Sequence, residues 1–412
     1  MLAELVFVTR LLGLMSGTRA IDMQVDPSVA AVELMLDGER AAVLRGAPWQ
    51  TKVNFGPELA PHELTAIARD AEGRELARDT QFINVPRPQA EIGVMFERDR
   101  ANIRWQHIGG AMPKKMTVKL GSRTLASTIT RSVKLPPLPP EALNVLSIDL
   151  QFEDGSTAQR DVVFGGFSEE LPAELTATIV RERPEGRKEK ANCFRSGARP
   201  VVASEVETGG AAVLVVRHYN PPEEQFEDRH LNQNHVREQT FAMPRTAVRF
   251  VWPVAKANAS AELFTTSALL SAAHGLRFLL LHVEGPKAFN VRLTDAVAVA
   301  GMEALREPRR RAVLLVLNGE EDRSRYRPEL VRRYLERLGV PLYVWSLAGP
   351  VRDSPWGPVE DVSLNERLLK AVRRLEADLA KQRIAWLPLN PYDALHVEAA
   401  ADCAWEPMAA RR

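Results

Sequence analysis

Residues 293–347 alternate between helix and strand patterns, and this feature constrains the fold of the chain more than any other. The segment 295–305 has the apolar spacing of a helix, and 312–317 is a short apolar run typical of a strand buried on both faces. A second helix is predicted over 328–339, with proline at its start and glycine at its end, before another apolar run at 340–347. Buried strands joined by a helix predict a parallel sheet with a right-handed crossover. The C-terminal half is therefore predicted to be an α/β domain.

The first 166 residues contain two copies of one alternating pattern. The turn signals at 36–38 and 71–73 recur at 120–122 and 153–155, an offset of roughly 82–84 residues that suits a small β-sandwich. Short strands separated by frequent turns favour a sandwich over a barrel. Neither copy contains a cysteine pair, so we expect immunoglobulin-like architecture without the antibody-type disulfide. The aromatic residues predicted to lie in the two cores are Trp49, Phe55, Trp105 and Phe152.

These patterns predict a multidomain chain. It begins with an all-β immunoglobulin-like sandwich over 1–87 and a second one over 88–166. A linker rich in charge and proline is predicted over 167–208, followed by a doubly wound α/β domain over 209–412. That domain is expected to end in a helix opened by a capping box at 363–366. A last strand over 384–389 should lie at a sheet edge, because it contains a proline.

Composition excludes few function classes but makes some improbable. The chain has 54 basic and 53 acidic residues, so its net charge of +1 gives no general attraction to nucleic acid or to anionic membranes. No stretch has the length of a membrane span, and Glu4 and Arg10 make the first twenty residues a poor signal peptide. The basic run 309–311 is expected to be a solvated helix end. Cys193 and Cys403 are expected to be unpaired, although a long-range disulfide stays open.

Two parts of the chain contain segments that match a known family. In the first sandwich these segments are 32–38, 48–49, 58–64 and 70–76, and in the α/β half they are 295–300, 314–322 and 339–345. On these segments the chain resembles the von Willebrand factor A-related proteins of acidobacteria and their relatives, in which immunoglobulin-like modules precede a von Willebrand factor A-type domain. The resemblance implies an α/β domain with a divalent cation bound by three loops at the carboxyl ends of its strands. It also favours an extracytoplasmic location, periplasmic or secreted.

The residues at the three metal-loop positions depart from the family pattern. Arg217 stands where the first loop should have an aspartate, and Tyr219 stands at the next ligand position. Val291 replaces a threonine in the second loop, and Asn318 replaces an aspartate in the third. A hard cation needs oxygen ligands with negative charge among them, and an arginine would repel it. We therefore predict a degenerate site with no metal and no cofactor. The weak substitute ligands are Asp295 and Asp322.

No other pattern indicates catalysis. The chain has no nucleophile elbow, P-loop or dinucleotide fingerprint. The histidines at 218, 230 and 235 are not accompanied by a CxxC or HExxH motif. A polar loop with scattered histidines is therefore favoured over a zinc site. We predict a non-enzymatic binding or scaffold protein that contacts a protein partner without metal. A cation-dependent adhesion domain with substitute ligands and an unrecognised hydrolase remain the alternatives.

The loops at the carboxyl ends of the α/β strands are the predicted binding surface, because open α/β sheets bind ligands there. They comprise 217–222, 290–295 and 318–327, with 348–358 beside them. Arg325 and Trp356 are the candidate partner-binding residues, since an exposed tryptophan is a common interface anchor. An equally open alternative packs Trp356 against the helix predicted over 363–382.

Overall fold

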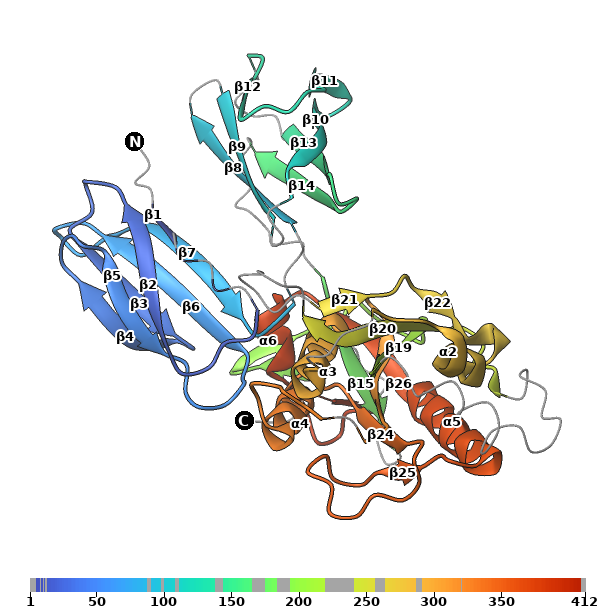
Figure 1. The fold of residues 1–412 in the computed structure, drawn as a ribbon. Coiled ribbons are helices and arrows are strands. Elements are labelled where there is room, and N and C mark those ends of the chain that lie inside the picture. The colour runs from blue at the N-terminus through green and yellow to red at the C-terminus, as the bar shows by residue number, and fades with distance from the viewer. Residues whose placement is uncertain are drawn as a thin grey trace. The chain divides into compact units, whose positions relative to one another are not determined.

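The computed structural model divides the chain into two compact units. One comprises Met1–Pro86 together with Glu174–Arg412, and the other comprises Arg87–Ala173. Figure 1 shows the course of the chain through both. The residues that the structure describes are 5–7, 9, 11, 13–86, 90–97, 100–107, 111–137, 144–164, 175–183, 193–218, 241–255, 264–286, 291–319 and 321–408.

The N-terminal part of the first unit is a sandwich of two antiparallel sheets, as its alternating pattern predicted. One sheet has the order β1-β2-β5 and the other the order β4-β3-β6-β7. The strands are β1 (Leu5–Phe7), β2 (Thr18–Val25), β3 (Ala31–Leu36), β4 (Glu39–Leu44), β5 (Gln50–Asn54), β6 (His62–Arg69) and β7 (Glu75–Ile83). Asp37 and Gly38 both adopt positive φ between β3 and β4, at 54° and 80°. The Asp-Gly signal therefore marks a tight hairpin turn.

The second unit repeats this topology strand for strand. Its sheets have the orders β12-β9-β8 and β11-β10-β13-β14, which correspond to those of the first sandwich. The predicted duplication is thus present as two immunoglobulin-like sandwiches. The strands are β8 (Ala90–Glu97), β9 (Arg100–His107), β10 (Pro113–Leu120), β11 (Arg123–Ala126), β12 (Ser132–Lys134), β13 (Asn144–Phe152) and β14 (Thr157–Phe164).

The four predicted core aromatics divide into two kinds. Phe55 and Phe152 are almost fully buried within the first and second sandwich respectively. Trp49 and Trp105 are only half-buried and pack against the edge of each core. Trp105 instead holds the Arg131 guanidinium 3.5 Å from its ring centroid, a cation–π contact at the surface. The alternating pattern predicted which residues share one face of a strand, but it did not predict that the two tryptophans are only half-buried.

The centre of the C-terminal part is a largely parallel sheet with the order β21-β20-β19-β23-β24-β25. The five strands from β20 to β25 run parallel, while β21 at the edge runs antiparallel to β20. Numbered by their appearance in the chain, the strands lie in the order 3-2-1-4-5-6 of doubly wound sheets. They are β19 (Ala211–Arg217), β20 (Thr246–Ala255), β21 (Phe264–Thr266), β23 (Arg310–Leu317), β24 (Leu342–Ser346) and β25 (Glu360–Asp361); β22 (Leu270–Ser271) pairs with β20 off this path.

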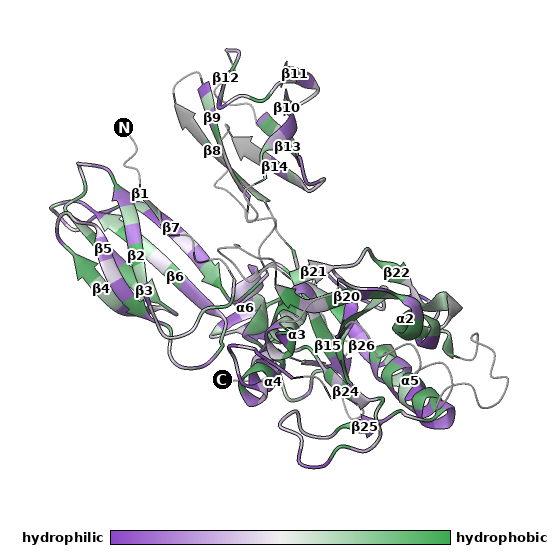
Figure 2. Cartoon of the chain, in the orientation of Figure 1, coloured by the Kyte–Doolittle hydropathy of each residue, from purple (hydrophilic) through white to green (hydrophobic). Residues whose placement is uncertain are grey.

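Helices cover both faces of this sheet (Figure 1). α3 (Leu293–Glu303) and α4 (Pro328–Arg337) share one core with the sheet, and α2 (Leu276–His282) and α5 (Asn365–Ala380) share the other. α5 is amphipathic, with apolar and polar residues both visible along it in Figure 2. Its predicted capping box is wrong, because the Ser363 hydroxyl bonds Asp361 instead of a helix amide. None of the helices in the described residues is long and apolar enough to cross a membrane.

The predicted linker over 167–208 is wrong where the structure describes it, since it contributes strands to a C-terminal β-module. In one sheet β26 lies between β18 and β15, with β28 outside; the second has the order β17-β16-β27. The strand predicted at a sheet edge over 384–389 corresponds to β26, which lies inside the sheet. Its proline, Pro388, follows the end of the strand and so does not interrupt the pairing. The strands are β15 (Thr176–Glu182), β16 (Phe194–Ser196), β17 (Arg199–Val201), β18 (Glu205–Glu207), β26 (Gln382–Leu387), β27 (Val397–Ala399) and β28 (Trp405–Pro407).

A disulfide joins the two segments of the C-terminal β-module. Cys193 and Cys403, expected to be unpaired thiols, are bonded to each other across 210 residues of sequence. Both contribute to the small apolar core of the module, and Cys403 is fully buried. Sequence spacing could not reveal this pairing, because the two segments that carry the cysteines meet only through the tertiary fold.

Two of the three arginines at 309–311 are buried in β23, so the expectation of a solvated run is wrong for them. Arg311 is 4% exposed and donates to the carbonyl of Ala304 at 3.2 Å. Burial lowers the pKa of its guanidinium to about 10. The Gln382 side chain pairs with both backbone groups of Arg311, at 2.8 and 3.0 Å, and so joins β23 to the C-terminal β-module.

The first sandwich packs directly against the α/β part of the same unit. Leu14 and Leu59 belong to the core that contains α3 and α4. Tyr334 of α4 donates its hydroxyl hydrogen to the carbonyl of Asn84 at 2.6 Å, and burial raises the pKa of this phenol well above its usual range. A further bond runs from the hydroxyl of Tyr392, in α6 (Pro391–Leu395), to the Asp37 carboxylate at 2.9 Å. Buried polar bonds of this kind fix the sandwich in one orientation on the helices.

Replacing both cysteines of the disulfide should destabilise the C-terminal β-module. We expect Cys193→Ala with Cys403→Ala to lower the free energy of unfolding by about 2–4 kcal/mol, because the open chain gains conformational entropy when it unfolds. Denaturant unfolding together with limited proteolysis of residues 176–207 checks this. Reductant should reproduce the loss in the wild type and add nothing in the variant. Equal stability of the two proteins would show that the bond is dispensable.

Candidate functional site

The predicted binding loops lie at the carboxyl ends of the parallel strands. β19 ends at Arg217, β23 at Leu317 and β24 at Ser346. Since β19 has β20 on one side and β23 on the other, the chain leaves it in opposite directions, and the crevice of a doubly wound sheet is expected there. Of the predicted binding loops, the structure describes residues 217–218, 291–295, 318–319 and 321–327, and 348–358 beside them.

Arg217, the residue at the first metal-loop position, is held in place by its surroundings. It is 6% exposed and donates from its guanidinium to the backbone carbonyl of Val283. The same guanidinium lies 5.4 Å from the ring centroid of Phe250 and 5.6 Å from that of Trp252. These contacts fix the guanidinium group at this position. Tyr219 lies outside the described residues.

The second and third positions offer no negative charge either. Val291 is buried, and its carbonyl accepts a bond from the backbone of Arg323 at 2.8 Å, which ties the two loops together. Asn318 is half-buried and directly follows the last paired residue of β23.

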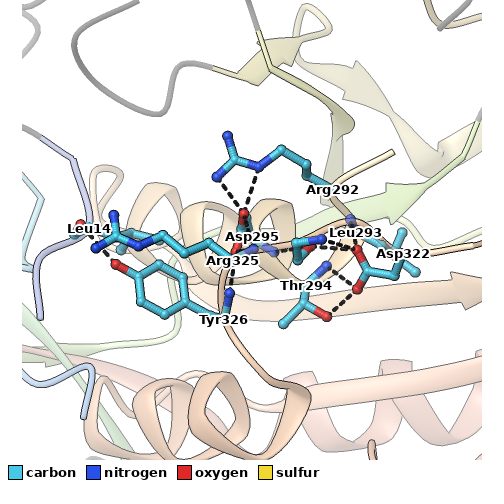
Figure 3. Close-up of polar contacts among 9 residues, drawn as sticks. Leu14, Arg292, Leu293, Thr294, Asp295, Asp322, Arg325 and Tyr326 are labelled. Atoms are coloured by element: carbon cyan, nitrogen blue, oxygen red, sulfur yellow. Dashed lines mark hydrogen bonds and ion pairs between the residues drawn. The ribbon is translucent and has the colours of Figure 1, made fainter. Parts of the chain in front are cut away.

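Asp322 caps the helix α3 from the neighbouring loop (Figure 3). Its carboxylate accepts bonds from the backbone of Leu293 at 2.8 Å and of Thr294 at 3.1 Å, and from the Thr294 hydroxyl at 2.5 Å. The backbone and hydroxyl of Ser324 donate to it as well, at 3.0 and 2.5 Å. The residue before α3 is Arg292, which supplies no side-chain cap. A negative charge at this end also complements the helix dipole.

Asp295 fixes the segment that leads into α4. Its fully buried carboxylate accepts bonds from the backbone of Arg325, at 3.0 and 3.2 Å, and of Tyr326 at 3.1 Å. The Arg292 guanidinium pairs with it at 2.5 and 2.7 Å. The Tyr326 hydroxyl then donates to the carbonyl of Leu14 at 3.0 Å. One chain of bonds therefore connects α3, the loop after β23 and the first sandwich (Figure 3).

These contacts decide whether the residues fit a hard cation. Mg²⁺ or Ca²⁺ needs several carboxylate or carbonyl oxygens that point into one space. The carboxylates of Asp295 and Asp322 already receive three and five donors respectively, counting the Arg292 guanidinium as one donor to Asp295. Freeing them would uncap α3 and leave Arg292 without this carboxylate. The oxygen atoms that could bind a divalent cation here are therefore already engaged in hydrogen bonds, and the site does not suit such an ion.

The two candidate partner residues differ in exposure. Arg325 is exposed, and its guanidinium lies 5.1 Å from the ring centroid of Tyr326. Trp356 is only 6% exposed and belongs to the core that contains α3 and α4. The exposed anchor predicted there is therefore wrong, and so is the alternative packing against α5, whose residues lie in the other core.

The predicted histidine cluster falls mostly outside the described residues, because only His218 is among them. Within the part of the chain that the structure describes, no three histidine, cysteine or carboxylate side chains are arranged to hold a metal ion.

A serine, a histidine and an aspartate meet in the second sandwich, which sequence reasoning missed. His107 Nε2 lies 2.9 Å from Ser156 Oγ and 3.2 Å from an Asp154 oxygen. The backbone of Ala111 donates to His107 Nδ1 at 3.2 Å, so the proton of a neutral imidazole sits on Nε2. Ser156 donates in turn to Asp154 at 2.7 Å. A nucleophilic serine needs the opposite tautomer, so this cluster braces the hairpin between β13 and β14.

Comparisons with known proteins do not assign this chain to a family. No family model matches it, and neither does any curated protein. Among solved structures, the fibronectin(III)-like modules of Clostridium thermocellum CbhA share 11% identity over 40% of this chain and 98% of that one, with a TM-score of 0.17.

Two other solved structures are similar at the same level. The central fibronectin-III array of RIM-binding protein shares 8% identity over 47% of this chain and 83% of its own, with a TM-score of 0.24. A β-glucuronidase of Parabacteroides merdae shares 15% over 39% of this chain and 24% of its own, with a TM-score of 0.18. At these scores the strand orders above, not the likeness, establish the sandwiches.

Removing the carboxylate that caps α3 should cost stability. Asp322→Ala should lower the free energy of unfolding by about 1–2 kcal/mol, because two helix amides and the Thr294 hydroxyl lose their acceptor. Asp322→Asn keeps one acceptor oxygen and should lose less. The neighbouring Glu321→Ala is the matched control, since that side chain is 77% exposed. Denaturant unfolding that ranks Asp322→Ala level with Glu321→Ala would contradict the capping role.

Proposed function

We propose that this chain is a non-enzymatic binding or scaffold protein whose α/β part is a von Willebrand factor A-like domain that has lost its metal site. The observation that carries the proposal is the use of Asp295 and Asp322. In such a domain, the loops at the carboxyl ends of the strands bind a cation and through it a partner. Here the available carboxylates hold helix ends and loops together, which supports a partner contact made without metal.

The order of the strands supports the α/β part of this proposal. The first strand, β19, lies in the middle of the sheet beside β23, and doubly wound folds bind ligands at the carboxyl ends of the strands where the strand order reverses. Two sandwiches of one topology in the same chain suit a protein that spaces or presents a binding domain.

An extracytoplasmic location accompanies this proposal. The Cys193–Cys403 disulfide supports it, since such bonds persist mainly in oxidising compartments.

The segment 323–327 is the part of the surface that we propose contacts the protein partner. It is anchored on its inner side by Ser324 and Tyr326, which bond Asp322 and Leu14 respectively. The alternate residues are exposed and are all arginines, at positions 323, 325 and 327. An anchored segment that presents arginines loses little conformational entropy on binding, and arginine is common at the centre of interfaces.

The two alternatives have less support. A cation-dependent adhesion domain would need Asp295 or Asp322 to exchange its present donors for a metal ion. An unrecognised hydrolase stays an alternative, but the one serine–histidine–aspartate cluster noted in the second sandwich has the wrong tautomer for a nucleophile. Neither alternative has an observation in its favour.

Divalent cations should leave the thermal stability unchanged. An ion that binds the native state stabilises it by mass action, by about 2.7 kcal/mol at a hundredfold excess over its dissociation constant. We expect no shift of Tm with millimolar Mg²⁺, Mn²⁺ or Ca²⁺. A rise in Tm that a chelator reverses, and that Asp295→Ala or Asp322→Ala removes, would favour the cation-dependent alternative and identify the ligands.

Partner binding should depend on Arg325 and not on metal. We expect Arg325→Glu to lose the proteins that the wild type retains from an extract of the source organism, with equal retention in chelator and in Mg²⁺. Lys381→Glu, which reverses a 63% exposed charge on another part of the surface, is the control and should retain them. Quantitative mass spectrometry measures retention. Normal binding by Arg325→Glu at wild-type Tm would move the surface elsewhere, to the sandwiches.

A further inference from the structure

We propose that Asn318 is a site of spontaneous deamidation, which replaces the amide at the end of β23 by a carboxylate. The proposal is independent of the function proposed above. Asn318-Gly319 is the only asparagine–glycine pair in the sequence. Such a pair reacts readily because the backbone nitrogen of the second residue attacks the asparagine side chain, and glycine has no side chain to hinder the approach.

The position of the pair in the fold favours this reaction. The pairing of β23 with β24 ends at Leu317, so Asn318 and Gly319 lie just beyond the sheet. Gly319 is exposed and has a φ of +81°. A Cβ built on it would meet nothing within 4 Å, so the space around this residue is open. The ladder of the sheet therefore ends before the reacting backbone, and among the described residues beyond its chain neighbours nothing lies close to the Cβ position of this glycine.

Other asparagines show what protection looks like. Asn84 is 2% exposed, and its side-chain amide donates to the carbonyls of Met15 and Ala60 at 2.8 and 2.7 Å. Its oxygen accepts from the backbone of Met15 at 2.7 Å, and the branched Val85 follows it. Asn54 is followed by Phe55, and its oxygen accepts from Gly56 at 3.0 Å. Bulk at the residue that follows opposes ring closure at both of these positions, whereas Asn318 is followed by glycine.

The reaction needs only water. The backbone nitrogen of Gly319 gives up its proton and bonds to Cγ of Asn318, the bond from Cγ to Nδ2 breaks, and ammonia leaves. Water then opens the five-membered ring at either carbonyl, which yields aspartate or isoaspartate at position 318. The second product lengthens the main chain by one carbon, in the loop that leads to Asp322 and the cap of α3.

The product changes the charge of the candidate binding surface. One new carboxylate lowers the formal net charge of the chain at pH 7 from +1 to zero. The position is the one at which the von Willebrand factor A pattern has its third-loop aspartate. The protein would therefore age into forms that differ in charge at this loop while the rest of the sequence stays the same.

The test follows peptides of the intact, disulfide-bonded chain incubated in mildly alkaline buffer. Trypsin releases 312–323, in which Asn318 is the sole asparagine, and 53–69, in which Asn54 is the sole asparagine. We expect the first peptide to be lost to two heavier products. An endoproteinase specific for aspartate should cut both at Asp322 but only one of them, the aspartate form, at position 318. The second peptide should stay unchanged. The folded protein should also move on ion exchange to the position of the Asn318→Asp variant.

Two controls decide the outcome. Asn318→Gln should remove both products and the shift on ion exchange, because a longer side chain closes the ring far more slowly. A synthetic peptide of 312–323 gives the rate without the fold. Conversion of the folded chain at a rate close to that of the peptide supports the proposal. An intact Asn318 after the free peptide has reacted, or conversion only in denaturant, would overturn it.

Discussion

Two carboxylates near the carboxyl ends of the parallel strands, those of Asp295 and Asp322, link the start of α3 to residues 322–326 through hydrogen bonds. Asp322 supplies the cap that the sequence at the start of α3 lacks, and Asp295 fixes the backbone that enters α4. The Tyr326 hydroxyl extends the connection to the first sandwich. Charge-assisted bonds to backbone amides are among the stronger hydrogen bonds, and several are partly or fully buried here. The geometry of the candidate binding loops depends on this one network.

The same network fixes its segments through contacts between protein groups. Backbone amides, hydroxyls and a guanidinium surround the carboxylates of Asp295 and Asp322. Close to the end of β19, the Arg217 side chain is held by the carbonyl of Val283 and lies near the ring of Phe250. These contacts set the geometry of the start of α3 and of residues 322–326.

Sequence reasoning predicted what depends on local pattern. The buried run of β23, the proline and glycine that bound the second helix and the Asp-Gly turn each act within a few residues, and all appear in the structure. It failed where distant segments meet. Three of the four strands within 176–207 have only three residues each, and all except β17 pair with β26, β27 or β28, which lie about 180 residues or more later in the chain.

The candidate site shows the same division. That Arg217, Val291 and Asn318 carry no carboxylate is visible in the sequence, whereas the hydrogen bonds of Asp322 to α3 are not. Its one local signal was the spacing of Asp322 and Ser324, which is typical of a side chain that bonds its own loop. Trp356 is a large apolar residue among prolines, and only the packing beneath it shows which core it joins.

The disulfide also determines which parts of the chain can carry mechanical load. It closes a covalent loop that contains the whole parallel sheet, since the sheet lies between Cys193 and Cys403. Tension applied at the two ends of the chain passes across the bond and bypasses residues 194–402. Fully extended, those residues would add on the order of 700 Å. Under such tension the two sandwiches can unfold while the α/β domain inside the covalent loop stays folded.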